Sequence, residues 1–286
     1  MIESSRRTFL GLTAVGLVGT IGVRSVRAQS GGILERLRKE KVIKIGIVNQ
    51  PPYSELKTDG SIDGASAIIV KMILEKIGIP KIEAFTGTYG QVIPGLQAGR
   101  WDMIGASLVV TKPRCEQVRY GDPIIFGSAS LGYLKSEMAP PAATLQAVGA
   151  SGVKVGLISG SNYIPTLQKF VTDPANIISY PDDLALTDGL LAKRHQVTLG
   201  AWMAMRKMLA QRPGSFEIIH PVTDLPITRS GPSFRLTDTD LYEAYEVELR
   251  KMMASGEVRR IVESYGLEGP PDGPVITAER ACSEAI

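Results

Sequence analysis

The chain contains the stretch Val42-Ile43-Lys44-Ile45-Gly46-Ile47-Val48, which is short, apolar and rich in β-branched residues. This composition predicts a buried strand, and Pro51 and Pro52 place a loop after it because prolines cannot continue a hydrogen-bonded ladder. Apolar residues at helical spacing predict a helix over residues 65–77. A second helix follows over 89–98 and a strand over 101–110. Strands that alternate with helices are typical of parallel sheets covered by helices, so we expect an α/β fold.

The alternation restarts after a polar interval with prolines at residues 135–152. The later pattern predicts strands over 153–158 and 196–199 and helices over 163–170, 202–209 and 240–253. Two α/β units in one chain predict two lobes. The space between lobes is a preferred position for a ligand site.

The first residues have the pattern of an export signal. Arg6 and Arg7 precede an apolar run over residues 9–23, and Val26-Arg27-Ala28 fits a small-residue cleavage site. The run is shorter than the roughly 18 residues of a membrane-spanning helix. We therefore expect a signal peptide over residues 1–28 and a mature protein in the periplasm. The paired arginines resemble a twin-arginine signal, and a Sec signal with incidental arginines is the alternative.

The charge balance argues against nucleic acid as a partner. The chain of 286 residues has 32 Lys and Arg, 29 Asp and Glu, and a formal net charge of +3. Residues 1–28 hold four of the arginines and one glutamate, so the remainder has 28 basic and 28 acidic residues. Phosphate neutralisation requires a clustered excess of Lys and Arg, which the mature chain lacks.

The cysteines and histidines indicate no cofactor. Cys115 and Cys282 are far apart in the sequence, no disulfide follows from this spacing, and we interpret Cys115 as a small packing residue rather than a nucleophile. The only histidines, His195 and His220, stand in no metal-binding motif, and no nucleotide-binding glycine motif occurs. We expect neither a metal nor another cofactor.

Three groups of residues are candidates for binding an anion or a small polar ligand. Arg114 falls in the first turn of a short helix after Thr111, where the helix dipole disfavours a cation unless an anion is bound there; a solvated surface arginine is the alternative. The loop Gly160-Ser161-Asn162 follows a strand and precedes a helix, which suits an anion or an ordinary N-cap. Tyr53 and Tyr89 fall where open α/β sheets bind ligands, although packing is the default role of a single tyrosine.

Five segments between Val42 and Leu267 carry a family resemblance: Val42 to Tyr53, YGQVIPGLQAGRWD at 89–102, Thr111 to Asp122, Val153 to Ser161, and Ser255 to Gly266. Taken together, they resemble the family 3 periplasmic solute-binding proteins of ABC importers. The stretch KPRCEQV at 112–118, with the Ile-Pro-Gly-Leu segment at 93–96, is most similar to the branch that binds ectoine and hydroxyectoine.

The resemblance implies a type II periplasmic binding protein fold, in which each lobe is a mixed sheet flanked by helices and two strands form the hinge. We expect the first lobe to comprise residues 29–133 and 226–268 and the second lobe residues 134–225. The polar, glycine- and proline-rich residues 269–286 are expected to form a flexible tail.

The resemblance also implies roles for individual residues. Arg114 would hold a ligand carboxylate, Tyr89 would stack on the ligand, and Ser107 and the Gly160-Ser161 loop would add hydrogen bonds. Gln50 and Tyr53 would lie in the loop after the first strand. The chain departs from the family's pattern at two positions where an acid usually holds the cationic group of the ligand. Gln50 stands at the position of the acid in ectoine binders, and Ala201 stands at the position of the acid in amino-acid binders. Glu55 could supply the missing negative charge, or the ligand could lack an ordinary ammonium group.

These expectations describe a monomeric, exported binding protein that is not an enzyme. It would capture a small zwitterion with a carboxylate, either a polar amino acid or an ectoine-like solute, and deliver it to a membrane permease. The alternative is a periplasmic enzyme on the same scaffold, similar to cyclohexadienyl or arogenate dehydratases, which would need a general acid such as Glu55 in the cleft.

Overall fold

The computed structural model describes residues 32–138 and 141–285. The predicted signal peptide, including its twin-arginine motif, lies outside these residues. Within them, no helix is long and apolar enough to cross a membrane.

The first sheet is built around the apolar stretch at 42–48. Its strand order is β4 (Lys81–Thr86), β1 (Val42–Ile47), β5 (Met103–Val109), β13 (Thr228–Phe234) and β6 (Arg119–Tyr120), and β7 (Ile125–Gly127) also pairs with β13. β1 is parallel to both β4 and β5, whereas β13 is antiparallel to its neighbours. The three isoleucines of β1 are fully buried, which explains why this strand takes a central position.

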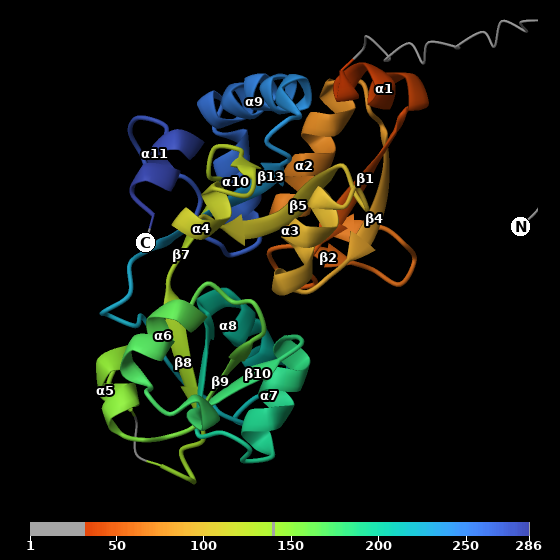
Figure 1. Cartoon of the computed structure of the whole chain (residues 1–286). Coiled ribbons are helices and arrows are strands. Elements are labelled where there is room, and N and C mark those ends of the chain that lie inside the picture. Colours follow the sequence, from red (N-terminus) through yellow and green to blue (C-terminus); the bar gives the residue numbers. More distant parts are fainter. Residues whose placement is uncertain (1–31, 139–140, 286) are drawn as a thin grey trace, which may run out of the picture. The chain divides into compact units, whose positions relative to one another are not determined.

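Helices pack on both faces of this sheet (Figure 1). The isoleucines of β1 contact one apolar core formed with α2 (Ala65–Lys76), α9 (Thr239–Ala254) and α10 (Glu257–Ser264). On the other face Trp101 packs beside α3 (Tyr89–Gln97) and donates a hydrogen bond of 3.0 Å to the Val92 carbonyl. A Cβ on Gly46 would come within 2.7 Å of the Trp101 ring, so glycine is required at the centre of β1.

The second sheet has the order β10 (Ile177–Tyr180), β9 (Val155–Ile158), β11 (Val197–Ala201), β8 (Ala129–Tyr133) and β12 (Glu217–Ile219). β9 is parallel to β10 and β11, and β8 is antiparallel to β11 and β12. The helices of this part of the chain are α5 (Leu145–Ala150), α6 (Ile164–Phe170), α7 (Asp183–Leu191) and α8 (Trp202–Gln211). The remaining elements are α1 (Ile33–Glu40), β2 (Glu55–Leu56), β3 (Ile62–Asp63), α4 (Lys112–Cys115), a 3₁₀ turn (Pro174–Asn176) and α11 (Ala278–Ser283).

The chain passes between the two sheets twice. It leaves the first sheet after β7 and enters the second at β8, with Ser128 between them, and it returns between β12 and β13. Residues 129–133, which we expected at the end of the first lobe, therefore pair within the second sheet. Gly127 and Ser128 mark the crossing only weakly, because strand-forming residues stand on both sides of them.

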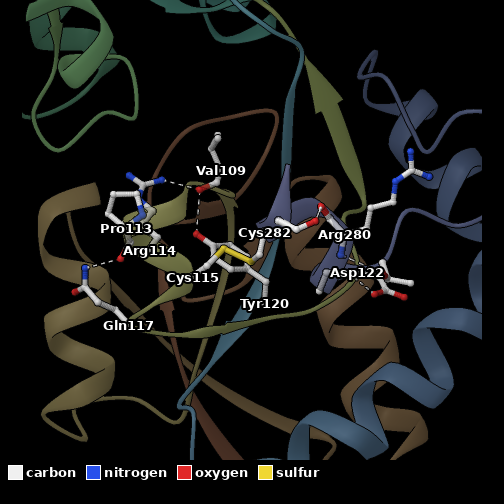
Figure 2. The surroundings of a disulfide bond; sticks show 12 residues. Val109, Pro113, Arg114, Cys115, Gln117, Tyr120, Asp122, Arg280 and Cys282 are labelled. Carbon is white, nitrogen blue, oxygen red and sulfur yellow. Dashed lines mark hydrogen bonds between the residues drawn. A yellow bond between two sulfur atoms is a disulfide. The ribbon is translucent and has the colours of Figure 1, made fainter. Parts of the chain in front are cut away.

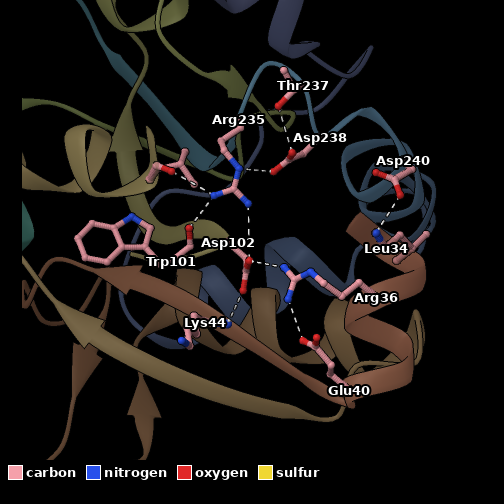
Figure 3. Close-up of polar contacts among 11 residues, drawn as sticks. Leu34, Arg36, Glu40, Lys44, Trp101, Asp102, Arg235, Thr237, Asp238 and Asp240 are labelled. Atoms are coloured by element: carbon pink, nitrogen blue, oxygen red, sulfur yellow. Dashed lines mark hydrogen bonds and ion pairs between the residues drawn. The ribbon is translucent and has the colours of Figure 1, made fainter. Parts of the chain in front are cut away.

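A network around Asp102 joins distant parts of the first lobe (Figure 3). The Asp102 carboxylate accepts hydrogen bonds from Arg36 in α1 at 2.8 Å and from the Lys44 backbone N–H in β1 at 3.0 Å. Arg235, just after β13, donates to the carbonyls of Trp101 at 2.8 Å and Leu96 at 3.1 Å. These bonds hold the C-terminal end of α3 against the sheet and so stabilise the helix that carries Tyr89.

The C-terminal segment is not a loose tail throughout, so that expectation is wrong for α11. Ala278 and Ala281 are buried, and the Ala278 N–H donates to the buried Asp122 carboxylate at 2.7 Å. Cys282 forms a disulfide with Cys115, with the two Cα atoms 6.0 Å apart (Figure 2). Cys115 packs beside an apolar core, in line with its interpretation as a packing residue, but it is not a free thiol, because the fold brings Cys282 to it.

We predict that removing this disulfide lowers stability substantially. The bond closes a loop with a sequence separation of 167 residues, and the chain-entropy model assigns a loop of this size about 5 kcal/mol. The double variant Cys115→Ser, Cys282→Ser should therefore show a lower free energy of unfolding in urea titrations. Wild type treated with a reductant should shift in the same way, and an unchanged midpoint in both would contradict the prediction.

Candidate ligand-binding site

A cavity of about 50 Å³ lies between the two sheets. Five of the predicted site residues line it: Gln50, Tyr53, Tyr89, Ser107 and Ser161. Further lining residues that the sequence did not single out include Phe126, Ser128, Tyr163 and Ser230. The cavity therefore combines aromatic rings with hydroxyl and amide groups from both lobes, as is typical of sites for small polar ligands.

A larger cavity of about 470 Å³ adjoins the first. Arg114 and Gly160 line only the larger one, whereas both are lined by Val109, Ser161, Asn162, Tyr163 and Thr228. The predicted residues are therefore distributed over two neighbouring cavities and not around a single one.

Tyr89 and Gln50 are held together by a direct contact. Tyr89 is the first residue of α3, which begins with a capping box formed by Thr88 and Gln91. Its hydroxyl donates to the Gln50 side-chain oxygen at 2.6 Å, in the loop that follows β1. This loop is closed by a backbone hydrogen bond of 2.9 Å from the Gln50 N–H to the Ser54 carbonyl. Both side chains are thus fixed at the carboxyl end of β1, where open α/β sheets bind ligands.

Ser107 lies on β5 and faces the neighbouring antiparallel strand. Its hydroxyl forms a hydrogen bond of 2.7 Å with the hydroxyl of Ser230 on β13, and Ser230 also donates to the Ile125 carbonyl at 3.2 Å. Cross-strand pairing therefore presents two hydroxyls to the cavity. Ser230 could not have been found from the sequence because its position depends on the register of β13 against β5.

Arg114 connects the two lobes. One guanidinium nitrogen donates to the Val109 carbonyl at the end of β5 at 2.9 Å, and another donates to the Gly160 carbonyl in the second lobe at 2.9 Å. The guanidinium carbon lies 5.9 Å from the centre of the Tyr89 ring. Figure 2 shows the side chain beside the disulfide, because Cys115 is the next residue of the short helix α4. The Arg114 guanidinium therefore lines the larger cavity, and the disulfide links its helix to α11.

Gly160 brings the second lobe close to the start of α3. Its φ angle is +74°, and a Cβ at this position would lie 2.9 Å from the Gly90 Cα. The backbone of the loop after β9 thus packs directly on the backbone of the first lobe, next to Tyr89. Only glycine permits both the left-handed conformation and this approach.

Glu55 is not brought to the cavity. It lies on β2, which pairs with β3, and its carboxylate is 3.9 Å from the Lys207 ammonium. The Glu55 side chain is 36% exposed, and it is not among the residues that line either cavity. The hairpin pairing that follows the Gln50 loop carries this side chain away from the site.

Asp183 is an acidic residue that the sequence analysis missed. It is the first residue of α7, whose N-cap Asp182 accepts a hydrogen bond from the Ala185 N–H at 2.7 Å. Burial raises the pKa of the Asp183 carboxyl to about 6, and the nearby Gln50 side chain lowers it in part. The stretch Tyr180-Pro181-Asp182-Asp183 has a recognisable helix-start signal, but nothing local shows how far the fold buries the second aspartate.

The remaining titratable groups near the site are neutral. Burial raises the pKa of the hydroxyls of Tyr53, Tyr89 and Tyr163, so these groups donate hydrogen bonds and do not act as bases. Burial lowers the pKa of His195 to about 4, and its ring contacts Tyr180 at 2.9 Å and Thr198 at 2.8 Å. This histidine is a packing residue in its neutral form. Among the described residues, no cluster of His, Cys, Asp and Glu could hold a metal.

Comparisons with known proteins agree with this architecture. A relative described as a probable amino-acid ABC transporter periplasmic-binding protein, from Sinorhizobium fredii, is 27% identical over 241 residues, which is 82% of this chain and 79% of the relative. The crystal structure of EhuB in complex with hydroxyectoine superposes with a TM-score of 0.78 and 28% identity, covering 88% of this chain and 95% of EhuB.

A third similarity concerns the fold alone. An ancestral amino acid-binding protein, described as a precursor of cyclohexadienyl dehydratase, superposes with a TM-score of 0.70 at 17% identity, covering 81% of this chain and 98% of the ancestral protein.

The model of the bacterial extracellular solute-binding proteins, family 3, matches residues 43–268. This chain has the two-lobed type II periplasmic binding protein fold and belongs to family 3 of the bacterial extracellular solute-binding proteins.

Proposed function

We propose that this protein captures a small zwitterion that carries a carboxylate and delivers it to the permease of an ABC transporter. The ligand would be a polar amino acid or an ectoine-like solute, as the printed names of the relatives suggest. The observation that carries the proposal is Arg114, whose guanidinium lies between the Val109 carbonyl, the Gly160 carbonyl and the Tyr89 ring.

The chemistry of these groups suits a carboxylate. A guanidinium offers five N–H donors in a plane, and carboxylates accept two of them at once. The ligand carboxylate would take the place of a carbonyl oxygen on Arg114 and would also accept hydrogen bonds from the Ser161 loop. The Tyr53 and Tyr89 rings would cover the remainder of the ligand, and Ser107 would contribute a hydroxyl.

Binding of such a ligand would be coupled to movement of the lobes. Both lobes line the smaller cavity, with Gln50 and Tyr89 from the first and Ser161 from the second. A ligand held there would contact both lobes and would so stabilise the form in which they are close together. The two crossings of the chain, near Ser128 and between β12 and β13, would act as the hinge.

The family suggests a periplasmic protein that is not an enzyme. Export through the twin-arginine route is proposed from the Arg6-Arg7 pair, and the protein would act as a monomer. Incubation with prephenate or arogenate should yield no aromatic product; its formation would favour the dehydratase alternative.

We predict that Arg114→Ala weakens ligand binding by about 10- to 150-fold, since hydrogen bonds to charged groups contribute about 1.5–3 kcal/mol. The ligand is first chosen by a thermal-shift screen of polar amino acids, hydroxyectoine, ectoine and glycine betaine, and its affinity is measured by calorimetry. Arg114→Lys should give an intermediate loss because it keeps the charge but not the planar fork. Arg119→Ala is the control, since Arg119 lies over the Tyr242 ring at 5.1 Å, away from both cavities. Equal affinities of wild type and Arg114→Ala would rule out the carboxylate role.

We also predict that Gly160→Ala reduces affinity by preventing close contact of the lobes. A methyl group there would overlap Gly90. The matched control is Gly152→Ala, because Gly152 has a similar φ of +68° and nothing within 4 Å of an added Cβ. Both variants should lose about 1–2 kcal/mol of stability from the left-handed backbone, but only Gly160→Ala should lose affinity. A comparable loss of affinity in both would show that strain and not lobe contact is responsible.

A further inference from the structure

The helix that carries Arg114 cannot fix this residue by itself. α4 is a single turn of four residues, none of them buried, and the side chain of its N-cap residue Thr111 makes no capping hydrogen bond. Isolated helices shorter than about 12 residues are marginally stable in water, so a single turn keeps its conformation through contacts with the rest of the fold. The position of Arg114 therefore depends on what holds α4 from outside.

The C-terminal helix α11 provides such a contact. The disulfide joins Cys115, the residue after Arg114, to Cys282 of α11 (Figure 2). Both cysteines pack against the apolar core that contains Trp101, and two buried alanines of α11 belong to the same core: Ala278 and Ala281. Because the covalent link is one residue from Arg114, it restricts the movement of α4 relative to α11.

α11 is fixed to the first lobe at both of its ends. At its first residue, the Ala278 N–H donates a hydrogen bond to the buried Asp122 carboxylate at 2.7 Å. Directly after its last residue, the Glu284 carboxylate lies 2.6 Å from the Arg229 guanidinium of β13. α11 is thus a firm support for α4, although it lies outside residues 43–268, which match the family model.

α11 also borders the proposed site. Three residues of its C-terminal part line the larger cavity together with Arg114: Ala281, Glu284 and Ala285. Arg114 donates to the Val109 carbonyl and to the Gly160 carbonyl, both at 2.9 Å. Hydrogen bonds weaken steeply when donor and acceptor are misaligned, so both bonds require that α4 stays in place.

We propose that the disulfide between Cys115 and Cys282 is a positioning element of the ligand site, which holds the Arg114 guanidinium where a ligand carboxylate can bind it. This inference rests on the proposed function, because it assigns the carboxylate to Arg114. Neither cysteine touches the ligand, and the disulfide acts on affinity through Arg114. Opening the disulfide therefore lowers the affinity for the ligand and not only the stability of the protein.

Reduction with dithiothreitol opens the disulfide reversibly. One thiolate of the reagent attacks a sulfur of the disulfide and forms a mixed disulfide, and the other cysteine leaves as a thiolate that takes up a proton. The second thiol of the reagent then attacks the mixed disulfide and releases the second cysteine. The protein gains two thiols, and the reagent is oxidised to a cyclic disulfide. The double variant Cys115→Ser, Cys282→Ser is the permanent equivalent.

The first measurement follows Arg114 by NMR without any ligand. In protein with isotope-labelled arginine, the Nε–H signal of Arg114 is the one that is missing from Arg114→Ala. We expect this signal to shift and to narrow when the disulfide is opened, because the guanidinium then moves more freely. The matched control is Arg235, which also donates to two backbone carbonyls, those of Leu96 and Trp101, but at the opposite end of β5. Its signal should not change.

The second measurement is calorimetry with hydroxyectoine and L-arginine as the probes, on oxidised wild type, reduced wild type and the double cysteine variant. We expect opening of the disulfide to weaken binding by about 3- to 10-fold, as for residues that act through a contact partner, and reoxidation to restore it. In the Arg114→Ala background, opening the disulfide should change the affinity by less than about twofold. Gly152→Ala controls for lowered stability itself, since an added Cβ there contacts nothing within 4 Å. Thermal melts establish that each variant is folded at the temperature of the titration.

An Arg114 signal that stays unchanged when the disulfide is opened would overturn the inference. An equal loss of affinity with and without the Arg114 side chain would do the same, because the disulfide would then act through the fold as a whole. A wild type that binds neither probe, although its Arg114 signal responds to reduction, would contradict the proposed function and still support the positioning of Arg114 by the disulfide.

Discussion

The position of Arg114 depends on two backbone carbonyls that belong to different lobes. Its guanidinium donates to Val109 at the end of β5 and to Gly160 in the loop after β9, both at 2.9 Å. A single side chain therefore joins the end of β5 in the first sheet to the loop after β9 in the second, and it lines the larger cavity. The close approach of Gly160 to Gly90 is possible only because the glycine has no Cβ. A ligand carboxylate that binds Arg114 would displace one or both of these carbonyl oxygens. Because the Gly160 carbonyl belongs to the second lobe, this exchange would couple ligand binding to the distance between the lobes.

The helix that carries Arg114 has only four residues and is stabilised from outside. The disulfide from Cys115 to Cys282 links it to α11, and α11 itself begins at a hydrogen bond from Ala278 to the buried Asp122. The Asp122 carboxylate also accepts a hydrogen bond from Arg250 at 2.9 Å. The C-terminal segment thus contributes to the site indirectly, by fixing the short helix next to the guanidinium.

Much of the fold could be predicted from local patterns. The apolar stretch at 42–48, the helices ended by Gly78 and Gly99, and the second strand before Gly160 all lie close to where the sequence placed them, and these three glycines have positive φ angles. Five of the eight predicted site residues line one cavity because the carboxyl ends of parallel strands share one edge of a sheet. The boundary between the lobes falls near Ser128 and not at residue 133, because strand-forming residues on both sides of Gly127-Ser128 hide the change of sheet.

The sequence by itself determined the alternation of strands and helices, the family, and the residue types that can bind a carboxylate, because these depend on side-chain periodicity and on motifs within short segments. Tertiary structure alone decided which distant residues meet. The pairing of Cys115 with Cys282, the hydrogen bond of Ser107 with Ser230 and the position of Glu55 in the β2–β3 hairpin each depend on segments far apart in the chain or on strand register. No local pattern encodes such contacts, since they form only when both lobes have folded.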